Sequence, residues 1–122
     1  MEKPARGRDI VERTFEFAVR IVKLADALAK RSRIGEKLAS QIIGSGTSIG
    51  ANVEEAQAAE SRADFIHKYK ISLKEARETK YWLRLVVAAG VVTEKSVAAL
   101  RAEADEISRV IAQIVINTRK KR

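Results

Sequence analysis

The chain has no cysteine and a single histidine, His67. The lack of cysteine excludes disulfide bonds and thiolate metal sites, and it is compatible with a reducing compartment. No apolar run is long enough to span a bilayer, and no charged segment followed by an apolar one and a cleavage site opens the chain. From these absences we expect a cytoplasmic protein with no membrane partner.

Residues that break helices are scarce as well. Pro4 is the single proline, and most of the six glycines lie between Gly35 and Gly50, whereas Ala, Leu, Glu, Lys and Arg are plentiful. These residues have high helix propensities, so the composition predicts an all-α chain. A length of 122 residues suits one domain that buries a core without cross-links.

Apolar periodicity predicts four helices between two polar tails. The helices cover about residues 10–31, 34–59, 62–89 and 94–118, and the tails cover 1–8 and 119–122. Asp9 and Ser61 open capping boxes, Thr93 precedes the last helix, and Gly90 suits the position after a helix C-terminus. The connections are so short that consecutive helices must be antiparallel. The sequence therefore predicts one up-and-down four-helix bundle over residues 1–122.

The first predicted helix carries two neighbouring apolar rows. One row is Phe17, Ile21, Leu24 and Leu28, and the other is Phe15, Ala18, Val22, Ala25 and Ala29. Together they cover about half of the helix circumference, and we expect both to face the core. The last helix has the most regular pattern, with apolar residues alternately three and four apart from Val97 to Ile114. That spacing is typical of a bundle helix.

Gly44, Gly46 and Gly50 fall inside the second predicted helix, where each costs about 1 kcal/mol relative to alanine. The apolar phase continues through them without a shift, so we interpret them as small residues that allow close helix packing. A phosphate-binding loop is the other interpretation. The segment lacks the Lys-Ser/Thr ending of a Walker loop and no strand precedes it, so no nucleotide or other cofactor is expected.

No constellation of residues indicates catalysis. His67 has no cysteine partner, and no serine has the context of a nucleophile elbow. Asp64 and His67 have the spacing of half a carboxylate-bridged di-metal motif, but the second pair is absent, so no metal site is expected. Asn52 lies near the core face, where we expect a structural polar group that bonds across helices, as with Ser45 or Ser48.

Helix 62–89 carries more apolar surface than one core can use. Ile71, Trp82 and Leu85 lie on an arc away from the residues that should face the interior. Scattered surface apolar residues are normal and explain this arc without any partner. A large aromatic residue aligned with two aliphatic ones resembles an interface anchor, however, so we expect a homo-oligomer that buries this arc.

The same helix carries a basic strip of Lys70, Lys74, Arg77 and Arg84, with Tyr81 at the same phase. Basic groups around an aromatic ring can hold phosphates and stack on a base. The formal net charge of +8 also favours acidic partners, nucleic acid first. A solvated face with internal pairs such as Lys74–Glu78 explains the strip equally well.

In an up-and-down bundle, further positively charged residues would lie at both ends. One end would carry Lys30, Arg31, Arg33, Lys37, Arg84 and Lys95. The other end would carry Lys3, Arg6, Arg8, Arg62, Arg119, Lys120, Lys121 and Arg122. In a symmetric oligomer each patch would repeat around the axis and form a ring of positive potential.

Three segments, Phe15–Leu24, Ser45–Glu55 and Phe65–Leu85, resemble one protein family. It is the family of four-helix bundle proteins encoded in intervening sequences of bacterial 23S ribosomal RNA genes. The most specific match is the signature formed here by Ser48, Ile49, Asn52 and Glu55. Gly50 before Ala51 and Val53 after Asn52 are mild departures from its commonest form.

The resemblance implies a left-handed up-and-down bundle whose second helix continues through its glycines. It also implies a homopentamer with a central channel, as in the related accessory proteins of diversity-generating retroelements, which bind nucleic acid and a reverse transcriptase through basic surfaces. No catalytic residues are implied. The residues Ser48, Ile49, Asn52 and Glu55 are carried over as a structural signature only.

These observations favour a non-enzymatic oligomeric bundle that binds RNA or DNA through basic surfaces. A protein-interaction scaffold, in which the excess charge serves only solubility, is the alternative from another class. An accessory subunit of a nucleic-acid enzyme such as a reverse transcriptase is the third interpretation.

Overall fold

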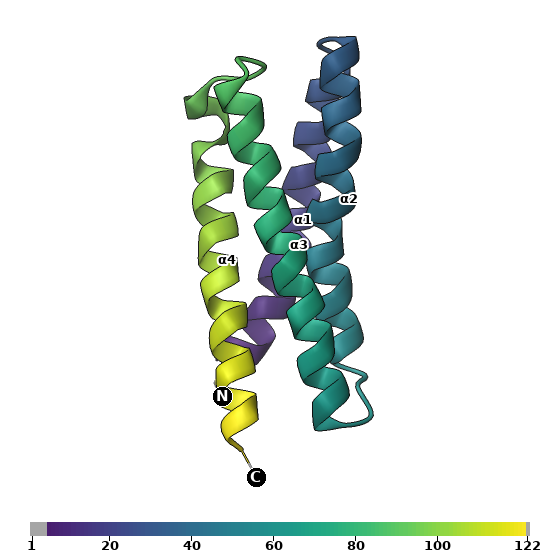
Figure 1. Ribbon diagram of the computed structural model, residues 1–122, viewed down its shortest axis with the longest axis vertical. Coiled ribbons are helices and arrows are strands. Elements are labelled where there is room, and N and C mark those ends of the chain that lie inside the picture. Colours follow the sequence, from purple (N-terminus) through teal and green to yellow (C-terminus); the bar gives the residue numbers. More distant parts are fainter. Residues whose placement is uncertain (1–4, 122) are drawn as a thin grey trace.

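The computed structural model describes residues 5–121, with side chains from Ile10 onward, and within this range it contains four helices and no strand. They are α1 (Ala5–Ala29), α2 (Arg33–Ala56), α3 (Arg62–Ala88) and α4 (Glu94–Lys120). Consecutive helices lie side by side and alternate in direction, as Figure 1 shows. Helix α4 also packs on α1, so the four helices close a bundle, and the all-α prediction is confirmed. None of the four helices, over the residues described, is apolar for long enough to cross a membrane.

The helix boundaries differ from the predicted ones by a few residues. Helix α1 already runs at Ala5, so Asp9 lies inside it and the predicted capping box there is wrong. Ala5 and Arg6 favour helix as strongly as the residues that follow them, so nothing local stops the helix at Asp9. Helix α4 extends to Lys120, because Arg119 and Lys120 suit the negative end of the helix dipole.

Hydroxyl side chains start the other three helices. Ser61 accepts a hydrogen bond from the backbone N–H of Asp64 at 3.0 Å, and Thr93 accepts one from Ser96 at 3.2 Å, which confirms both predicted starts. The structure adds a third cap at Ser32, which accepts from Gly35 at 2.9 Å. At the other end of α3, Gly90 has a φ of 78°, a conformation that glycine adopts without strain.

The core runs along the bundle axis and draws on every helix. Its largest fully buried side chains are Ile10, Phe17, Ile21, Leu28, Ile42, Ile49, Val53, Tyr69, Leu83, Val86, Ile107 and Ile111. The first apolar row of α1 faces this core, whereas the second row faces it only at Ala25: Phe15 is 61% exposed and Val22 is 46% exposed. Helix α1 touches α2 and α4 but not the diagonal α3, so only one side of it is covered.

Two glycines inside α2 allow it to pack closely against α1. A Cβ atom on Gly46 would lie 2.8 Å from two carbons of the Ile21 side chain, and one on Gly50 would lie 3.1 Å from the Thr14 carbonyl oxygen. Both glycines are therefore packing residues in a continuous helix, as predicted. Gly44 has nothing within 4 Å of such an atom, so the packing interpretation is wrong for that glycine.

Buried hydroxyl groups link α2 to α3. Ser72 donates to the carbonyl oxygen of Ile49 at 2.8 Å, and Thr79 donates to the Ser45 hydroxyl at 2.9 Å. Asn52 does not take part: its side chain donates to the Ser48 carbonyl of its own helix at 2.9 Å. The expectation that Asn52 bonds across helices is therefore wrong, and Ser45 makes the cross-helix bond instead.

Candidate nucleic-acid interface

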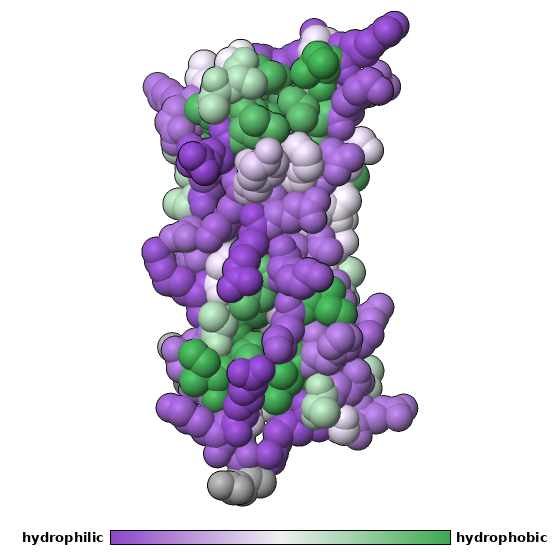
Figure 2. Space-filling view, in the orientation of Figure 1, coloured by the Kyte–Doolittle hydropathy of each residue, from purple (hydrophilic) through white to green (hydrophobic). Residues whose placement is uncertain are grey.

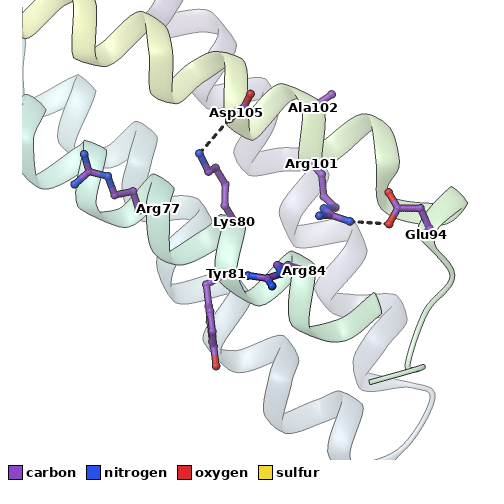
Figure 3. A pocket seen from close by; sticks show the side chains of 8 residues that line it. All are labelled: Arg77, Lys80, Tyr81, Arg84, Glu94, Arg101, Ala102 and Asp105. Atoms are coloured by element: carbon purple, nitrogen blue, oxygen red, sulfur yellow. Dashed lines mark hydrogen bonds and ion pairs between the residues drawn. The ribbon is translucent and has the colours of Figure 1, made fainter. Parts of the chain in front are cut away.

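A cleft of about 500 Å³ lies between α3 and α4, near the end of the bundle where these helices connect. It is lined by Arg77, Lys80, Tyr81, Arg84, Glu94, Arg101, Ala102 and Asp105 (Figure 3). Three members of the predicted basic strip, Arg77, Tyr81 and Arg84, belong to this lining. Figure 2 shows that the face of the bundle turned to the viewer is largely hydrophilic between two hydrophobic areas.

Helix geometry explains why these three residues meet. Tyr81 follows Arg77 by four positions and precedes Arg84 by three, so all three lie on one face of α3. The predicted strip continues along α3 with Lys70 and Lys74, which are exposed. We call these five residues the α3 basic strip.

Helix α4 supplies the opposite wall, because the short connection around Gly90 makes it run antiparallel to α3. Lys80 reaches across and pairs with Asp105 at 3.1 Å, and Arg101 pairs with Glu94 of its own helix at 2.6 Å (Figure 3). The hydrogen bond from Lys80, together with the charge of Arg109, lowers the pKa of Asp105 below its usual value. Both carboxylates of the cleft are thus occupied by cations.

Arg77 and Arg84 are left with no acidic partner among residues 10–121, although both line the same cleft. A solvated face would contain an ion pair between Lys74 and Glu78, but this pair does not form among the described side chains. Glu78 instead accepts a hydrogen bond from the indole N–H of Trp82 at 3.1 Å. Positive charge on this face is therefore in excess and open to an external anion.

The sequence analysis missed the α4 side of the cleft, namely Arg101, Ala102 and Asp105, and it missed Lys80 on α3. A usable signal was present. Two antiparallel helices joined at Gly90 place Tyr81 roughly level with Arg101, because the two residues are equally distant from the turn in sequence. Counting outward from the turn would have brought the two walls together.

Positive residues also gather at the ends of the bundle. At the end with the α1–α2 connection, Arg31 donates to the Val91 carbonyl oxygen at 2.5 Å, which joins the α1–α2 and α3–α4 connections. Lys30 pairs with Asp26 at 3.0 Å, and Arg33 and Lys37 are exposed. Arg31 and Lys30 are therefore exposed but have partners, unlike Arg77 and Arg84.

At the opposite end, Arg62 of α3 donates to the carbonyl oxygen of Lys121. Arg119, Lys120 and Lys121 are exposed there, in agreement with the predicted grouping. Arg122 and Lys3 lie outside the described residues, as do the side chains of Arg6 and Arg8.

The predicted oligomer arc of Ile71, Trp82 and Leu85 is not an exposed apolar face. All three side chains are half-buried, and Trp82 packs against the core. Its indole N–H donates to Glu78 of the same helix, so its polar group has a partner. They are therefore less exposed than the sequence analysis expected, and their role in an oligomer interface stays a prediction.

The exposed apolar surface lies instead on the opposite half of the bundle. Phe15, Val19 and Val22 follow one face of α1, and Ile43 lies across from Val22 on α2. Two shallow hollows of about 260 and 290 Å³ between the helices complete this α1–α2 groove. The signal was present in the second apolar row of α1, which the sequence analysis assigned to the core.

The signature residues of α2 have structural contacts. Ile49 is fully buried, and Ser48 donates to the Gly44 carbonyl oxygen at 2.6 Å. Glu55 pairs with Lys68 of α3 at 2.9 Å, and this contact raises the pKa of Lys68. The side chain of His67 is exposed, and among the residues whose side chains are described no three acidic, histidine or cysteine groups converge as metal ligands.

The comparisons with known proteins agree with this architecture. Residues 6–113 match the model of the 23S rRNA-intervening sequence protein family. Among solved structures, the chain is similar to a protein of unknown function from the S23 ribosomal protein family of Bacteroides thetaiotaomicron, with 39% identity and a TM-score of 0.84. The similarity covers 90% of this chain and 97% of that one, whereas no curated protein matches. The chain therefore belongs to the 23S rRNA-intervening sequence protein family.

Proposed function

We propose that this protein is a non-enzymatic bundle that binds nucleic acid through the α3 basic strip. One observation carries the proposal: Arg77 and Arg84 line an open cleft without an acidic partner among the described side chains, while both neighbouring carboxylates are occupied. A guanidinium group has five N–H donors and stays charged at any physiological pH, so it suits the oxygens of a phosphate.

The arrangement of the strip favours a polyanion over a single small anion. Lys70 and Lys74 extend the positive face along α3 beyond the cleft, so that charge is spread over about four helical turns. A chain of phosphates can neutralise several of these groups together and release the counterions that surround it. The net charge of +8 adds long-range attraction.

Charge reversal on the strip tests the proposal. Binding of a ribosomal RNA fragment is measured by filter retention at two salt concentrations, for the parent chain and for the Arg77→Glu/Arg84→Glu variant. We expect the variant to bind less tightly and its salt dependence to flatten by about two units on a log–log plot, roughly one for each lost phosphate contact.

The control is Arg20→Glu/Lys23→Glu, which changes the net charge equally on the exposed side of α1, across the bundle from α3. It should keep the parent salt dependence. Equal losses in the two variants would mean that only net charge matters, and no retention of the parent at low salt would overturn nucleic-acid binding and favour a protein scaffold.

Self-association is a second proposal, which the α1–α2 groove favours. Exposed apolar side chains that form a continuous surface mark interaction sites in soluble proteins. Phe15, Val19, Val22 and Ile43 form such a surface on the side away from the α3 basic strip. An assembly through this groove, for which the family resemblance implies five copies, would leave the strip of every copy open and multiply its charge.

A further inference from the structure

Tyr81 is an aromatic residue in an unusual position, because 55% of it is exposed on the face of α3 that carries the basic strip. Its hydroxyl group makes no hydrogen bond to any described residue. The Trp82 ring lies next to that of Tyr81, with ring centroids 5.1 Å apart and planes at 74°. Trp82 itself packs against the core and donates a hydrogen bond to Glu78.

Cations flank this ring on both sides along the helix. Arg77 lies one turn before Tyr81 and Arg84 one turn after it, and both lack an acidic partner in the described chain. In Figure 3 the ring of Tyr81 points away from the Lys80–Asp105 and Arg101–Glu94 pairs. The ring is therefore at the rim of the cleft, where a ligand reaches it without breaking an ion pair.

An open ring between two free guanidinium groups distinguishes single strands from duplexes. In a duplex the bases are stacked on one another, so only phosphates reach the protein surface outside the grooves. In a single strand an unpaired base can stack on an aromatic side chain while the neighbouring phosphates contact cations. Every base offers a π-face, so such a site tolerates any sequence.

We propose that Tyr81 is a stacking platform for one unpaired base of a single-stranded nucleic acid, with Arg77 and Arg84 holding the phosphates on either side. The proposal rests on the nucleic-acid binding proposed above and adds its substrate class. Phosphate contacts belong to the arginines and occur with any polynucleotide, whereas contact with the ring requires a base that is free of its complement.

The test measures fluorescence anisotropy with three labelled probes: a ten-residue oligouridine, a ten-residue oligothymidine and a ten-base-pair RNA duplex. The variants are Tyr81→Leu, which keeps apolar bulk without a π-face, and Tyr81→Phe, which restores the ring. We expect Tyr81→Leu to weaken both single strands by about 5- to 150-fold, the range for loss of one base–aromatic stack, and the duplex by less than twofold. Tyr81→Phe should bind the single strands as the parent does.

The possible outcomes distinguish base stacking on Tyr81 from the nucleic-acid binding on which it rests. Base stacking is overturned if Tyr81→Leu weakens the binding of single strands and duplex equally, or weakens the binding of neither. Nucleic-acid binding still stands in that case if Arg77→Gln/Arg84→Gln weakens the binding of all three probes. If no probe binds the parent at low salt, both proposals fail. If the single strands depend on Tyr81, the tighter of the two shows whether RNA or DNA is the source of the base, because a contact to the 2′-hydroxyl favours only oligouridine. Far-ultraviolet circular dichroism confirms that each variant keeps its helix content.

Discussion

The α1–α2 and α3–α4 pairs of this bundle are built by different means. Helices α1 and α2 meet through glycines, with a Cβ position on Gly46 only 2.8 Å from Ile21. Helices α3 and α4 leave a cleft of about 500 Å³ on their outer side, and Lys80 bridges it to Asp105. The first pair carries an apolar groove on its outer side, and the second carries a charged cleft.

Because of this difference, we expect substitutions in the two helix pairs to affect different properties, stability in one case and recognition in the other. Close packing at the contact between α1 and α2 leaves no room for larger residues, so substitutions at that contact should act on folding. The exposed ion pairs of the α3–α4 pair contribute little to stability, so substitutions there should act on the charge presented to a partner. One pair can therefore change its surface without endangering the fold, and three measurements examine whether this holds.

The largest expected effect concerns assembly through the α1–α2 groove. Phe15→Glu replaces the most exposed side chain of its apolar surface with a charge and should convert the proposed assembly to the 13.5 kDa monomer, as measured by multi-angle light scattering. Ile116→Glu is the matched control, since Ile116 is 45% exposed on α4 and outside the groove. A parent chain that is already monomeric, or equal effects of both variants, would contradict assembly through this groove.

The next effect concerns close packing. Alanine at Gly46 gains about 1 kcal/mol of helix propensity but forces its Cβ into the buried, branched side chain of Ile21, which we expect to cost about 2–3 kcal/mol. Gly44→Ala meets no neighbour and should stabilise the bundle by about 1 kcal/mol. Urea denaturation measures both changes.

Ile21 itself provides the check on this explanation. In an Ile21→Ala background the space beside Gly46 is empty, so Gly46→Ala should become neutral or stabilising. If Gly46→Ala instead destabilises both backgrounds equally, the two side chains do not compete for the same space, and the close approach of α1 and α2 has another basis.

The smallest expected effect on stability concerns Asp105. In the folded protein the pKa of Asp105 is lowered, first by the hydrogen bond from Lys80. Any stabilisation from this shift is therefore present above the unfolded pKa of 3.8, and it is lost as the pH falls through the lower folded pKa. At neutral pH we expect Asp105→Asn to leave the urea midpoint unchanged, because both partners are well exposed.

The same variant should alter binding. Without the carboxylate, Lys80 loses its partner and joins Arg77 and Arg84 as a free cation, so nucleic-acid affinity should rise and its salt dependence should steepen. A large loss of stability, or weaker binding, would show that the α3–α4 pair depends on this bridge as a structural element.

The fold was largely predictable because helix periodicity and capping are local properties. Ser61, Thr93 and Gly90 marked helix ends correctly, and the unbroken apolar phase through Gly46 and Gly50 predicted one continuous α2. The second row of α1 was predicted wrongly for a non-local reason. Whether Phe15 and Val22 are covered depends on which helices touch α1, and periodicity does not contain that information.

The candidate site was predictable on one helix only. The phase of α3 placed Arg77, Tyr81 and Arg84 together, since residues four and three apart share a face. Which of the strip's charges are free depends on partners from elsewhere, such as Asp105 for Lys80. Trp82 was assigned to an exposed arc because its own helix cannot show that its ring packs against the core.

The contact between Tyr81 and Trp82 provides a natural optical reporter. Trp82 is the single tryptophan of the chain, and its ring centroid is 5.1 Å from that of Tyr81. Its emission therefore comes from one location, next to the ring of Tyr81. A ligand that settles on the neighbouring ring changes the polarity and quenching around this fluorophore, so occupancy can be followed in the unlabelled protein.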